Sequence, residues 1–136
     1  MTSRPLCVLV VDDEAPFRRT LVKRLAHRGV SASGAGSGLE ALELLARGGV
    51  DVVVLDMKMP GIDGIETLAR IKERGLPVEV VLLTCHADID AARLAMEGGA
   101  FDYMLKPIDI DELLWAVEEA GGRVRARCGD VSGSGE

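Results

Sequence analysis

Polar side chains that could do chemistry follow four apolar runs of the chain, each at the point where the run ends. They are Asp12, Asp13 and Glu14, then Asp56, Thr84 and Lys106. Carboxylates held close together repel one another, and their pKa values rise unless a cation lies between them. A hard divalent cation such as Mg²⁺ relieves that repulsion and prefers oxygen ligands. The acidic residues therefore predict a cation site if the fold brings them together.

A carboxylate in such a cluster can also act as a nucleophile toward phosphorus and form an aspartyl phosphate. That transfer requires positive charge near the phosphoryl oxygens. A bound cation supplies part of the charge, and Lys106 supplies a further point charge. The Thr84 hydroxyl and backbone N–H groups could donate hydrogen bonds. The residues needed for phosphoryl transfer to a carboxylate are all present.

The elements that must position these residues alternate along the chain. Short apolar runs predict strands over 6–11, 30–35, 52–55, 78–83 and 101–105. Helical spacing predicts helices over 16–27, 39–46, 65–73 and 110–120, and a further helix through Glu97 with Asp88 as its N-cap. Nearly unbroken aliphatic runs are typical of strands buried on both faces of a parallel sheet. The alternation predicts an α/β fold of βαβ units, with helices on both faces of an open sheet.

In such a sheet, ligands bind beyond the carboxyl ends of the strands. Each candidate residue directly follows a predicted strand, so the fold would gather them on one rim. Taken singly, an Asp after a strand is usually a turn or cap residue, and Asp12, Asp13 and Glu14 could simply cap the first helix. Matching groups at four strand ends favour the chemical interpretation over a set of unrelated caps.

Composition limits the classes of partner. The chain has 136 residues, 48% hydrophobic and 28% charged, which fits one globular domain. A net charge of −6 and 3% aromatic residues argue against binding of nucleic acid or of an anionic membrane. Cys7, Cys85 and Cys128 are odd in number and far apart, which argues against a disulfide framework or a zinc site. No apolar stretch approaches the ~20 residues of a membrane span, and the expected location is the cytoplasm.

Four segments together resemble, in order and spacing, the receiver domain of two-component response regulators. They are Val-Val-Asp12-Asp13-Glu14, Leu55-Asp56-Met-Lys-Met-Pro60-Gly61-Ile-Asp63-Gly64, Leu-Leu-Thr84 and Gly99-Ala100-Phe-Asp-Tyr103-Met-Leu-Lys106-Pro107. The last segment is most similar to receivers of the nitrogen-regulation type. The resemblance implies a flavodoxin-like, doubly wound (βα)5 fold whose parallel sheet has the order 2-1-3-4-5. The resemblance extends to about Ala120, so a receiver domain is predicted over residues 1–120. The change to a Gly-Gly pair, arginines and a Gly/Ser-rich end predicts that 121–136 are a flexible tail or the start of a linker.

The same resemblance assigns roles at the strand ends. Asp56 would be the phosphoacceptor and would bind Mg²⁺, or Mn²⁺ in its place. Asp13 and the backbone carbonyl of Lys58 would be further direct ligands, and Asp12 would act through a water molecule. Lys106 would contact the phosphoryl group.

Other positions would respond to the phosphoryl group or tune its lifetime. Thr84 would donate a hydrogen bond to it, and Tyr103 would be the aromatic switch residue that turns inward as Thr84 moves. Lys58 and His86 match positions that affect how quickly receivers lose phosphate, and a solvated His86 is favoured over a metal ligand. The structural positions are Pro60 and Gly64 in the loop after the phosphoacceptor, and Pro107, where the family commonly has a cis peptide bond.

The function implied is a phosphorylation switch. A sensor histidine kinase or phosphotransfer protein would phosphorylate Asp56, and a downstream output domain or protein would read the change. The surface that changes would be the helix after Asp88, the strand with Tyr103 and the last helix, and homodimerisation through this face is left open. Trp115 on that helix is interpreted as an ordinary core or rim aromatic. The protein would not be an enzyme, because it would catalyse only its own phosphorylation and slow dephosphorylation.

Two alternative functions stay open at this point. A phosphatase or mutase with an aspartyl-phosphate intermediate usually has a second acid two residues after the nucleophile, where this chain has Lys58. A receiver-like interaction module that is never phosphorylated would not need the aspartates, the threonine and the lysine intact. A nucleotide site at 34–38 is disfavoured, because these glycines lack the full G-x-G-x-x-G spacing.

Overall fold

The computed structural model describes residues 4–127, and within them the predicted sheet forms. Its strands are β1 (Cys7–Val11), β2 (Ser31–Ala35), β3 (Val52–Asp56), β4 (Glu79–Thr84) and β5 (Asp102–Leu105). They pair in parallel in the order β2-β1-β3-β4-β5, which confirms the expected fold class and strand order.

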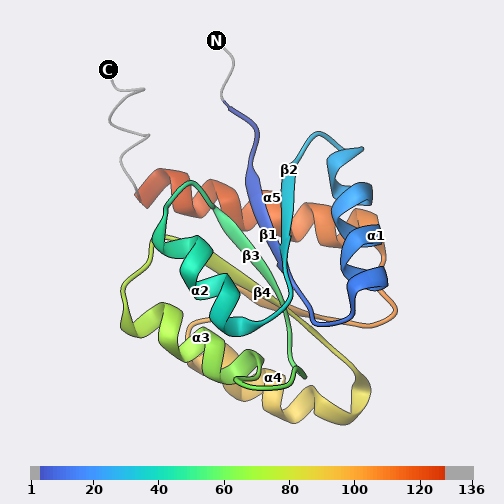
Figure 1. The fold of residues 1–136 in the computed structure, drawn as a ribbon, viewed down its shortest axis with the longest axis vertical. Coiled ribbons are helices and arrows are strands. Elements are labelled where there is room, and N and C mark those ends of the chain that lie inside the picture. The colour runs from blue at the N-terminus through green and yellow to red at the C-terminus, as the bar shows by residue number, and fades with distance from the viewer. Residues whose placement is uncertain (1–3, 128–136) are drawn as a thin grey trace.

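Helices cover both faces of this sheet. They are α1 (Ala15–Ala26), α2 (Gly38–Ala46), α3 (Gly64–Glu73), α4 (Ile89–Glu97) and α5 (Ile110–Arg127), with a short 3-10 helix, η1 (His86–Asp88), before α4. Figure 1 shows α2, α3 and α4 in front of the sheet and α5 behind it, and the buried side chains of α1 and α5 share the rear cluster. This two-sided covering is why the central strands β3 and β4 are aliphatic except at their ends.

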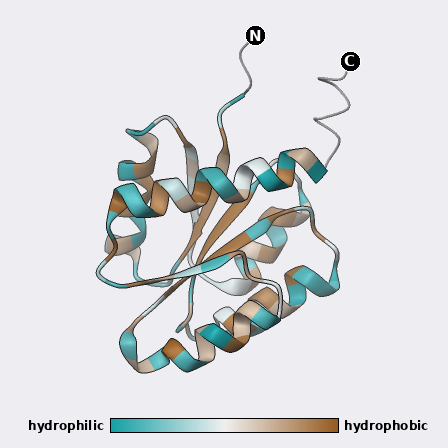
Figure 2. Ribbon diagram, turned by 180° about the vertical axis from the view of Figure 1, so that it is seen from behind, coloured by the Kyte–Doolittle hydropathy of each residue, from teal (hydrophilic) through white to brown (hydrophobic). Residues whose placement is uncertain are grey.

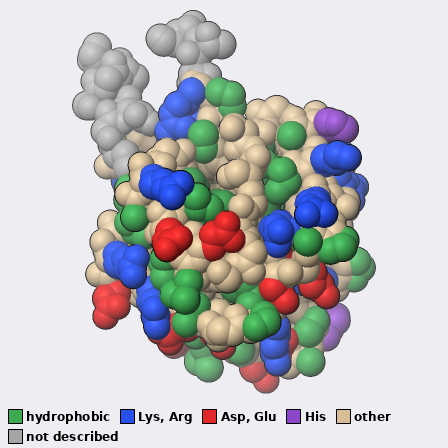
Figure 3. Space-filling model, in the orientation of Figure 1, with side chains coloured by type: hydrophobic (Ala, Val, Ile, Leu, Met, Phe, Trp, Pro, Cys, Tyr) green, Lys and Arg blue, Asp and Glu red, His purple; other side chains and the backbone are tan. Residues whose placement is uncertain are grey.

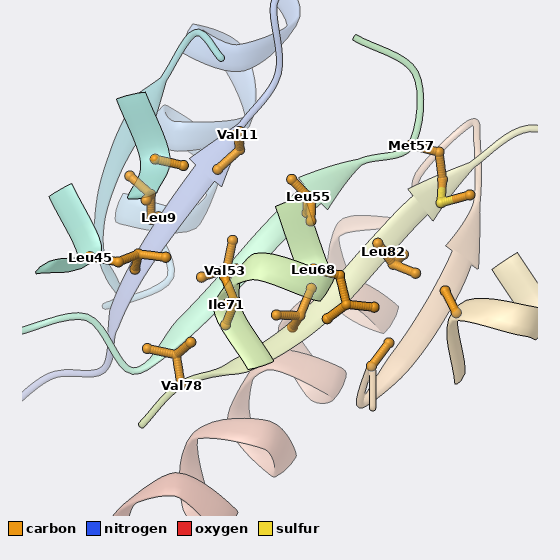
Figure 4. Close-up of a cluster of buried hydrophobic side chains, with 14 of the residues drawn as sticks. Leu9, Val11, Leu45, Val53, Leu55, Met57, Leu68, Ile71, Val78 and Leu82 are labelled. Carbon is orange, nitrogen blue, oxygen red and sulfur yellow. The ribbon is translucent and has the colours of Figure 1, made fainter. Parts of the chain in front are cut away.

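The core consists of two aliphatic layers separated by the sheet. Alternate β3 residues face opposite layers: Val53 and Leu55 belong to the α2–α4 side, and Val52 and Val54 to the α1 and α5 side. Figure 4 shows the first of these layers, where Leu68 of α3 packs over the strands. In Figure 2 the strands are largely brown, whereas the helices alternate teal and brown. The four apolar side chains of β3, Val52 to Leu55, are fully buried, and each contributes about 1.5–3 kcal/mol.

The weakest predicted strand, over 30–35, forms β2 at the edge of the sheet. It pairs only with β1 among the described strands, and Ser31, Ser33 and Gly34 are exposed. Its polar composition reflects this position, because an edge strand has solvent on one side.

Helix α5 extends beyond the domain boundary that the sequence predicts after Ala120. It runs to Arg127, so 121–127 are helical and not a flexible tail, and 128–136 lie outside the described residues. Arg125 lies 3.4 Å from Asp51 Oδ2, and Arg127 lies 2.8 Å from Glu79 Oε2. These ion pairs attach the last turns to the amino edge of the sheet. They offset the low helix propensity of the Gly-Gly pair.

The structure refines two local predictions, for Asp88 and Trp115. Asp88 occupies the N-cap position of α4, but its side chain makes no capping hydrogen bond there. The sequence predicts Trp115 to be a core or rim aromatic, and with 64% of its surface exposed it lies at the rim and not in the core. Leu113, Ala116 and Val117 turn toward the sheet, and the helical period places Trp115 away from them.

Charged side chains of both signs are interspersed over the face seen in Figure 3. Across 4–127, every helix is too short or too polar to cross a membrane.

Candidate functional site

The predicted site residues meet at the carboxyl edge of the sheet. Asp12 follows the last residue of β1, Asp56 is the last residue of β3, and these strands are neighbours. Thr84 ends β4 and pairs with the β5 residue that precedes Lys106. Parallel pairing therefore brings together residues that lie up to 94 positions apart in the chain (106 − 12).

Three carboxylates form a cluster at this edge. Oxygens of Asp12, Asp13 and Asp56 all lie within 4.8 Å of one another. Asp12 and Asp56 are buried, with 1% and 7% of their surface exposed, whereas Asp13 is exposed. The backbone N–H of Glu14 donates to Asp12 Oδ1 at 2.9 Å. Asp12 Oδ2 is buried and has no hydrogen-bond partner among the described residues.

The surroundings of Asp12 disfavour its charged form. Burial is the main cause of its raised pKa, and the nearby charges of Asp56 and Asp13 act in the same direction. The Glu14 N–H and the Lys106 ammonium offset part of this effect. A divalent cation would relieve the remaining repulsion and satisfy the buried Oδ2, so the cluster fits such an ion.

Lys106 provides the positive charge that pairs with the acidic cluster. Its Nζ donates to Asp56 Oδ1 at 2.7 Å and lies 3.8 Å from Asp12 Oδ2. It also lies 4.9 Å from the centre of the Phe17 ring, which supports the ammonium through a cation–π contact. Burial lowers the pKa of Lys106, but the hydrogen bond and charge of Asp56, with the charges of Asp12 and Glu14, outweigh burial and leave the pKa raised.

A cleft of about 260 Å³ opens beside this ion pair. Its lining residues are Asp13, Glu14, Asp56, Met57, Lys58, Leu83, Thr84, Cys85, Asp88 and Lys106. Thr84 is buried, and its hydroxyl donates to the Cys85 carbonyl at 3.2 Å. The cleft is large enough for a phosphoryl group and gives that group a carboxylate, an ammonium and a hydroxyl as neighbours.

The loop between β3 and α3 depends on its glycines. A Cβ on Gly64 would lie 2.5 Å from the carbonyl oxygen of Asp56, so α3 approaches the end of β3 only with glycine at this position. Gly61 has a φ of +78°, which favours glycine. Pro60 is exposed beside it, which suits the turn predicted there. The Lys106–Pro107 peptide bond is cis.

Of the tuning and switch positions, Lys58 and Thr84 lie at the acidic cluster, whereas His86 and Tyr103 lie apart from it. Lys58 lines the cleft, whereas His86 is exposed at the start of η1 and is not among the described lining residues. Tyr103 is half-buried and lines a larger cavity of about 650 Å³ between β5 and α5.

Two neighbours of the site were not identified from the sequence. Phe17 has apolar helical spacing, which indicates only a core position, yet its ring lies against Lys106. Asp88 has the sequence signal of a cap, yet it lines the cleft. Neither contact has a local sequence signal, because each joins residues far apart in the chain.

Comparisons with known proteins agree with this geometry. The sequence model of the response regulator receiver domain matches residues 8–118. DNA-binding transcriptional regulator NtrC of Escherichia coli (strain K12) is 44% identical over 113 residues, which cover 83% of this chain and 24% of that protein. Sporulation initiation phosphotransferase F of Bacillus subtilis (strain 168) is 37% identical over 112 residues, which cover 82% of this chain and 90% of that protein.

A solved structure shows the same fold. The crystal structure of a response regulator receiver domain protein from Clostridium thermocellum has a TM-score of 0.85 and 35% identity, covering 89% of this chain and 98% of the other. The chain spans only 24% of the length of the NtrC relative, so the match concerns one domain of that protein. Fold, site geometry and family match agree, and the chain belongs to the response regulator receiver domain family of two-component signalling systems.

Proposed function

We propose that Asp56 is the residue that accepts the phosphoryl group in this receiver. The observation that carries the proposal is the contact of 2.7 Å between Asp56 Oδ1 and Lys106 Nζ inside a cleft that also contains Thr84. An oxygen of Asp56 attacks phosphorus, the bond from phosphorus to the donor's leaving atom breaks, and the donor leaves with that electron pair. Lys106 neutralises charge on the transferred group. Thr84 gives up its hydrogen bond to the Cys85 carbonyl, and its hydroxyl then donates a hydrogen bond to a phosphoryl oxygen.

The acidic cluster supports Mg²⁺ as the ion of this reaction, with Mn²⁺ as an alternative. Asp13 and Asp56 would hold it directly with the Lys58 carbonyl, and Asp12 would hold it through water. When bound, the ion neutralises charge on the phosphoryl oxygens during transfer. The buried Oδ2 of Asp12 supports this assignment. It accepts no hydrogen bond among the described residues and has only the Lys106 ammonium, at 3.8 Å, as an opposite charge, and a buried carboxylate oxygen is costly without a hydrogen bond.

The response is proposed to pass from Thr84 to Tyr103. They lie on adjacent strands two register positions apart, because Leu82 pairs with Tyr103 and Thr84 with Leu105. Tyr103 is half-buried beside the cavity between β5 and α5, so it has room to change position. His86 and Lys58 are proposed to tune the lifetime of the phosphoryl group.

The partners follow from the family. The phosphodonor is proposed to be a sensor histidine kinase or a phosphotransfer protein. The NtrC relative is described as a DNA-binding transcriptional regulator, and the region matched here is 24% of it. A downstream output domain or protein is therefore proposed to act beyond the residues of this receiver. A homodimer through α4, β5 and α5 and a cytoplasmic location stay predictions from the sequence.

The protein is further proposed to turn over no external substrate. The family match does not support the phosphatase or mutase alternative. Steady release of phosphate from a small phosphoester, at a rate that depends on Asp56, would contradict this part of the proposal.

The central test is phosphorylation by a small donor. The chain is incubated with Mg²⁺ and acetyl phosphate, and the intact mass and Trp115 fluorescence are recorded. We expect the mass of one added phosphoryl group in the wild type and no addition in Asp56→Ala. Asp90→Asn, which changes an exposed carboxylate on α4, is the matched control and is expected to be phosphorylated normally. An unchanged wild-type mass, with beryllofluoride also leaving the fluorescence identical to that of Asp56→Ala, would refute the proposal.

A further inference from the structure

The carboxylate of Asp88 makes an ion pair and a thiol hydrogen bond in place of the hydrogen bond that a helix cap would accept. It makes no capping hydrogen bond to α4, although it occupies the N-cap position. Lys58 Nζ lies 3.4 Å from its Oδ1, and the Cys85 thiol donates to its Oδ2 at 3.2 Å. Only 15% of the Asp88 side chain is exposed. The side chain therefore joins the loop after β3 to the loop after β4.

This contact lies in the phosphoacceptor cleft. Lys58 and Asp88 both line the cleft that contains Asp56 and Lys106. Lys58 is two residues after Asp56, and its side chain is 78% exposed. Its ammonium is held at this position by Asp88, whereas Asp56 is paired with Lys106. The cleft therefore contains a second ammonium whose charge is already compensated.

The pairing of the Lys58 ammonium with Asp88 matters because a phosphodonor such as acetyl phosphate is an anion. An ammonium attracts such a donor less strongly when a carboxylate lies beside it, because the carboxylate repels the donor and keeps the ammonium at a distance from it. We propose that Asp88 is a positioning residue that holds Lys58 away from an incoming phosphoryl group and so lowers the affinity of the cleft for anionic donors. This inference rests on the proposed role of Asp56.

The test uses the dependence of the phosphorylation rate on acetyl phosphate concentration, with Mg²⁺ constant. In Asp88→Asn we expect the half-saturating concentration to fall about two- to five-fold, within the range of exposed ion pairs. The maximum rate should not change, because Asp56 and Lys106 are untouched. Asp88→Glu should restore the wild-type value, since it can hold Lys58 again. Asp90→Asn is the matched control and should match the wild type.

A double-mutant cycle tests whether Asp88 acts by holding Lys58 or only by its own negative charge. In the Lys58→Met background, Asp88→Asn removes one negative charge but releases no ammonium. We expect its effect there to be at least two-fold smaller than in the wild type. Equal effects in the two backgrounds would show that Asp88 acts by its charge alone, and would overturn the inference.

The remaining outcomes are also decisive. Lys58→Met alone should raise the half-saturating concentration, because it leaves Asp88 as an unpaired anion at the cleft. This measurement tests the inference even if Asp88→Asn does not fold, and an unchanged value would overturn it. A wild type that is phosphorylated with the same kinetics as Asp88→Asn would refute the inference and leave the role of Asp56 intact. A wild type that is not phosphorylated at all would refute both.

Discussion

Lys106 and Asp56 form an ion pair of 2.7 Å across the carboxyl edge of the sheet, although neither strand that positions them pairs with the other. β4 lies between them and contributes Thr84 to the same cleft. The ion pair therefore forms only if β3, β4 and β5 keep their register. A change in that register would separate Lys106 from Asp56.

Replacing Lys106 tests the electrostatic part of this relationship. In Lys106→Met, we expect the maximum rate of phosphorylation by acetyl phosphate to fall on the order of 100-fold, as when one donor to a developing anion is removed. The rate is measured by intact mass over time. Lys106→Arg keeps the charge and should recover part of the rate. A rate for Lys106→Met within about two-fold of the wild type would show that the ammonium is not needed.

Asp12→Asn should stabilise the protein in the absence of divalent ions. The substitution removes a charge that burial and two neighbouring carboxylates disfavour. A gain of about 0.5–2 kcal/mol, roughly 2–8 °C in the melting temperature, is expected from thermal unfolding in EDTA. Saturating Mg²⁺ should stabilise the wild type, by ~2.7 kcal/mol at 100 times its Kd, and the variant much less. Equal Mg²⁺ stabilisation of both proteins would contradict a role for Asp12 at the ion.

The pH dependence of this stability difference has a definite sign. The pKa of Asp12 is raised in the folded protein, so the folded state binds the proton more tightly than the unfolded state does. Lowering the pH through the folded pKa toward the ordinary value of 3.8 therefore favours folding through this group. The advantage of Asp12→Asn should be largest near neutral pH and shrink as the pH falls, as measured by urea unfolding without metal. An advantage that grows as the pH falls would show the opposite linkage.

Gly64→Ala should damage the site through the backbone. Its Cβ would lie 2.5 Å from the Asp56 carbonyl oxygen and 2.8 Å from Met57 Cα, neither of which can rotate away. We expect a loss of about 1–3 kcal/mol in the free energy of unfolding, together with slower phosphorylation of Asp56. Gly122→Ala is the control, because a Cβ there meets nothing within 4 Å. In mid-helix it should stabilise by about 0.5–1 kcal/mol. Loss of stability in both variants alike would remove the steric explanation.

Arg125→Met tests what holds the end of α5. It removes a contact of 3.4 Å to Asp51 Oδ2 and a hydrogen bond of 2.9 Å to the Pro5 carbonyl, while Asp51 keeps its partner Arg4. A loss of about 1–2 kcal/mol is expected, with faster amide hydrogen exchange confined to the last turns of α5. Arg93→Met, an exposed substitution on α4, should change neither measurement. Unchanged exchange in α5 would mean that helix propensity alone maintains these turns.

Sequence reasoning located the strands and the site because both have local signals. The aliphatic runs at 6–11, 52–55 and 78–83 differ from the observed strands by one residue at one or both ends, since burial on both faces requires apolar residues along most of each strand. It failed at the end of α5, where Gly-Gly is a poor helix signal. The ion pairs that extend this helix reach Asp51 and Glu79 on other elements, and no local window contains them.

The amino-acid sequence by itself determined which groups lie on the rim of this receiver. In a parallel sheet every strand delivers the residue after its carboxyl end to the same edge, so the order of strands and polar residues is sufficient. Only the tertiary structure decided which of these charged groups form ion pairs or hydrogen bonds with one another. It leaves Asp12 Oδ2 buried without a hydrogen bond among the described residues, assigns Lys106 to Asp56, and pairs Lys58 with Asp88. These choices depend on distances of a few ångströms between loops far apart in the chain, which no spacing of residues along the sequence encodes.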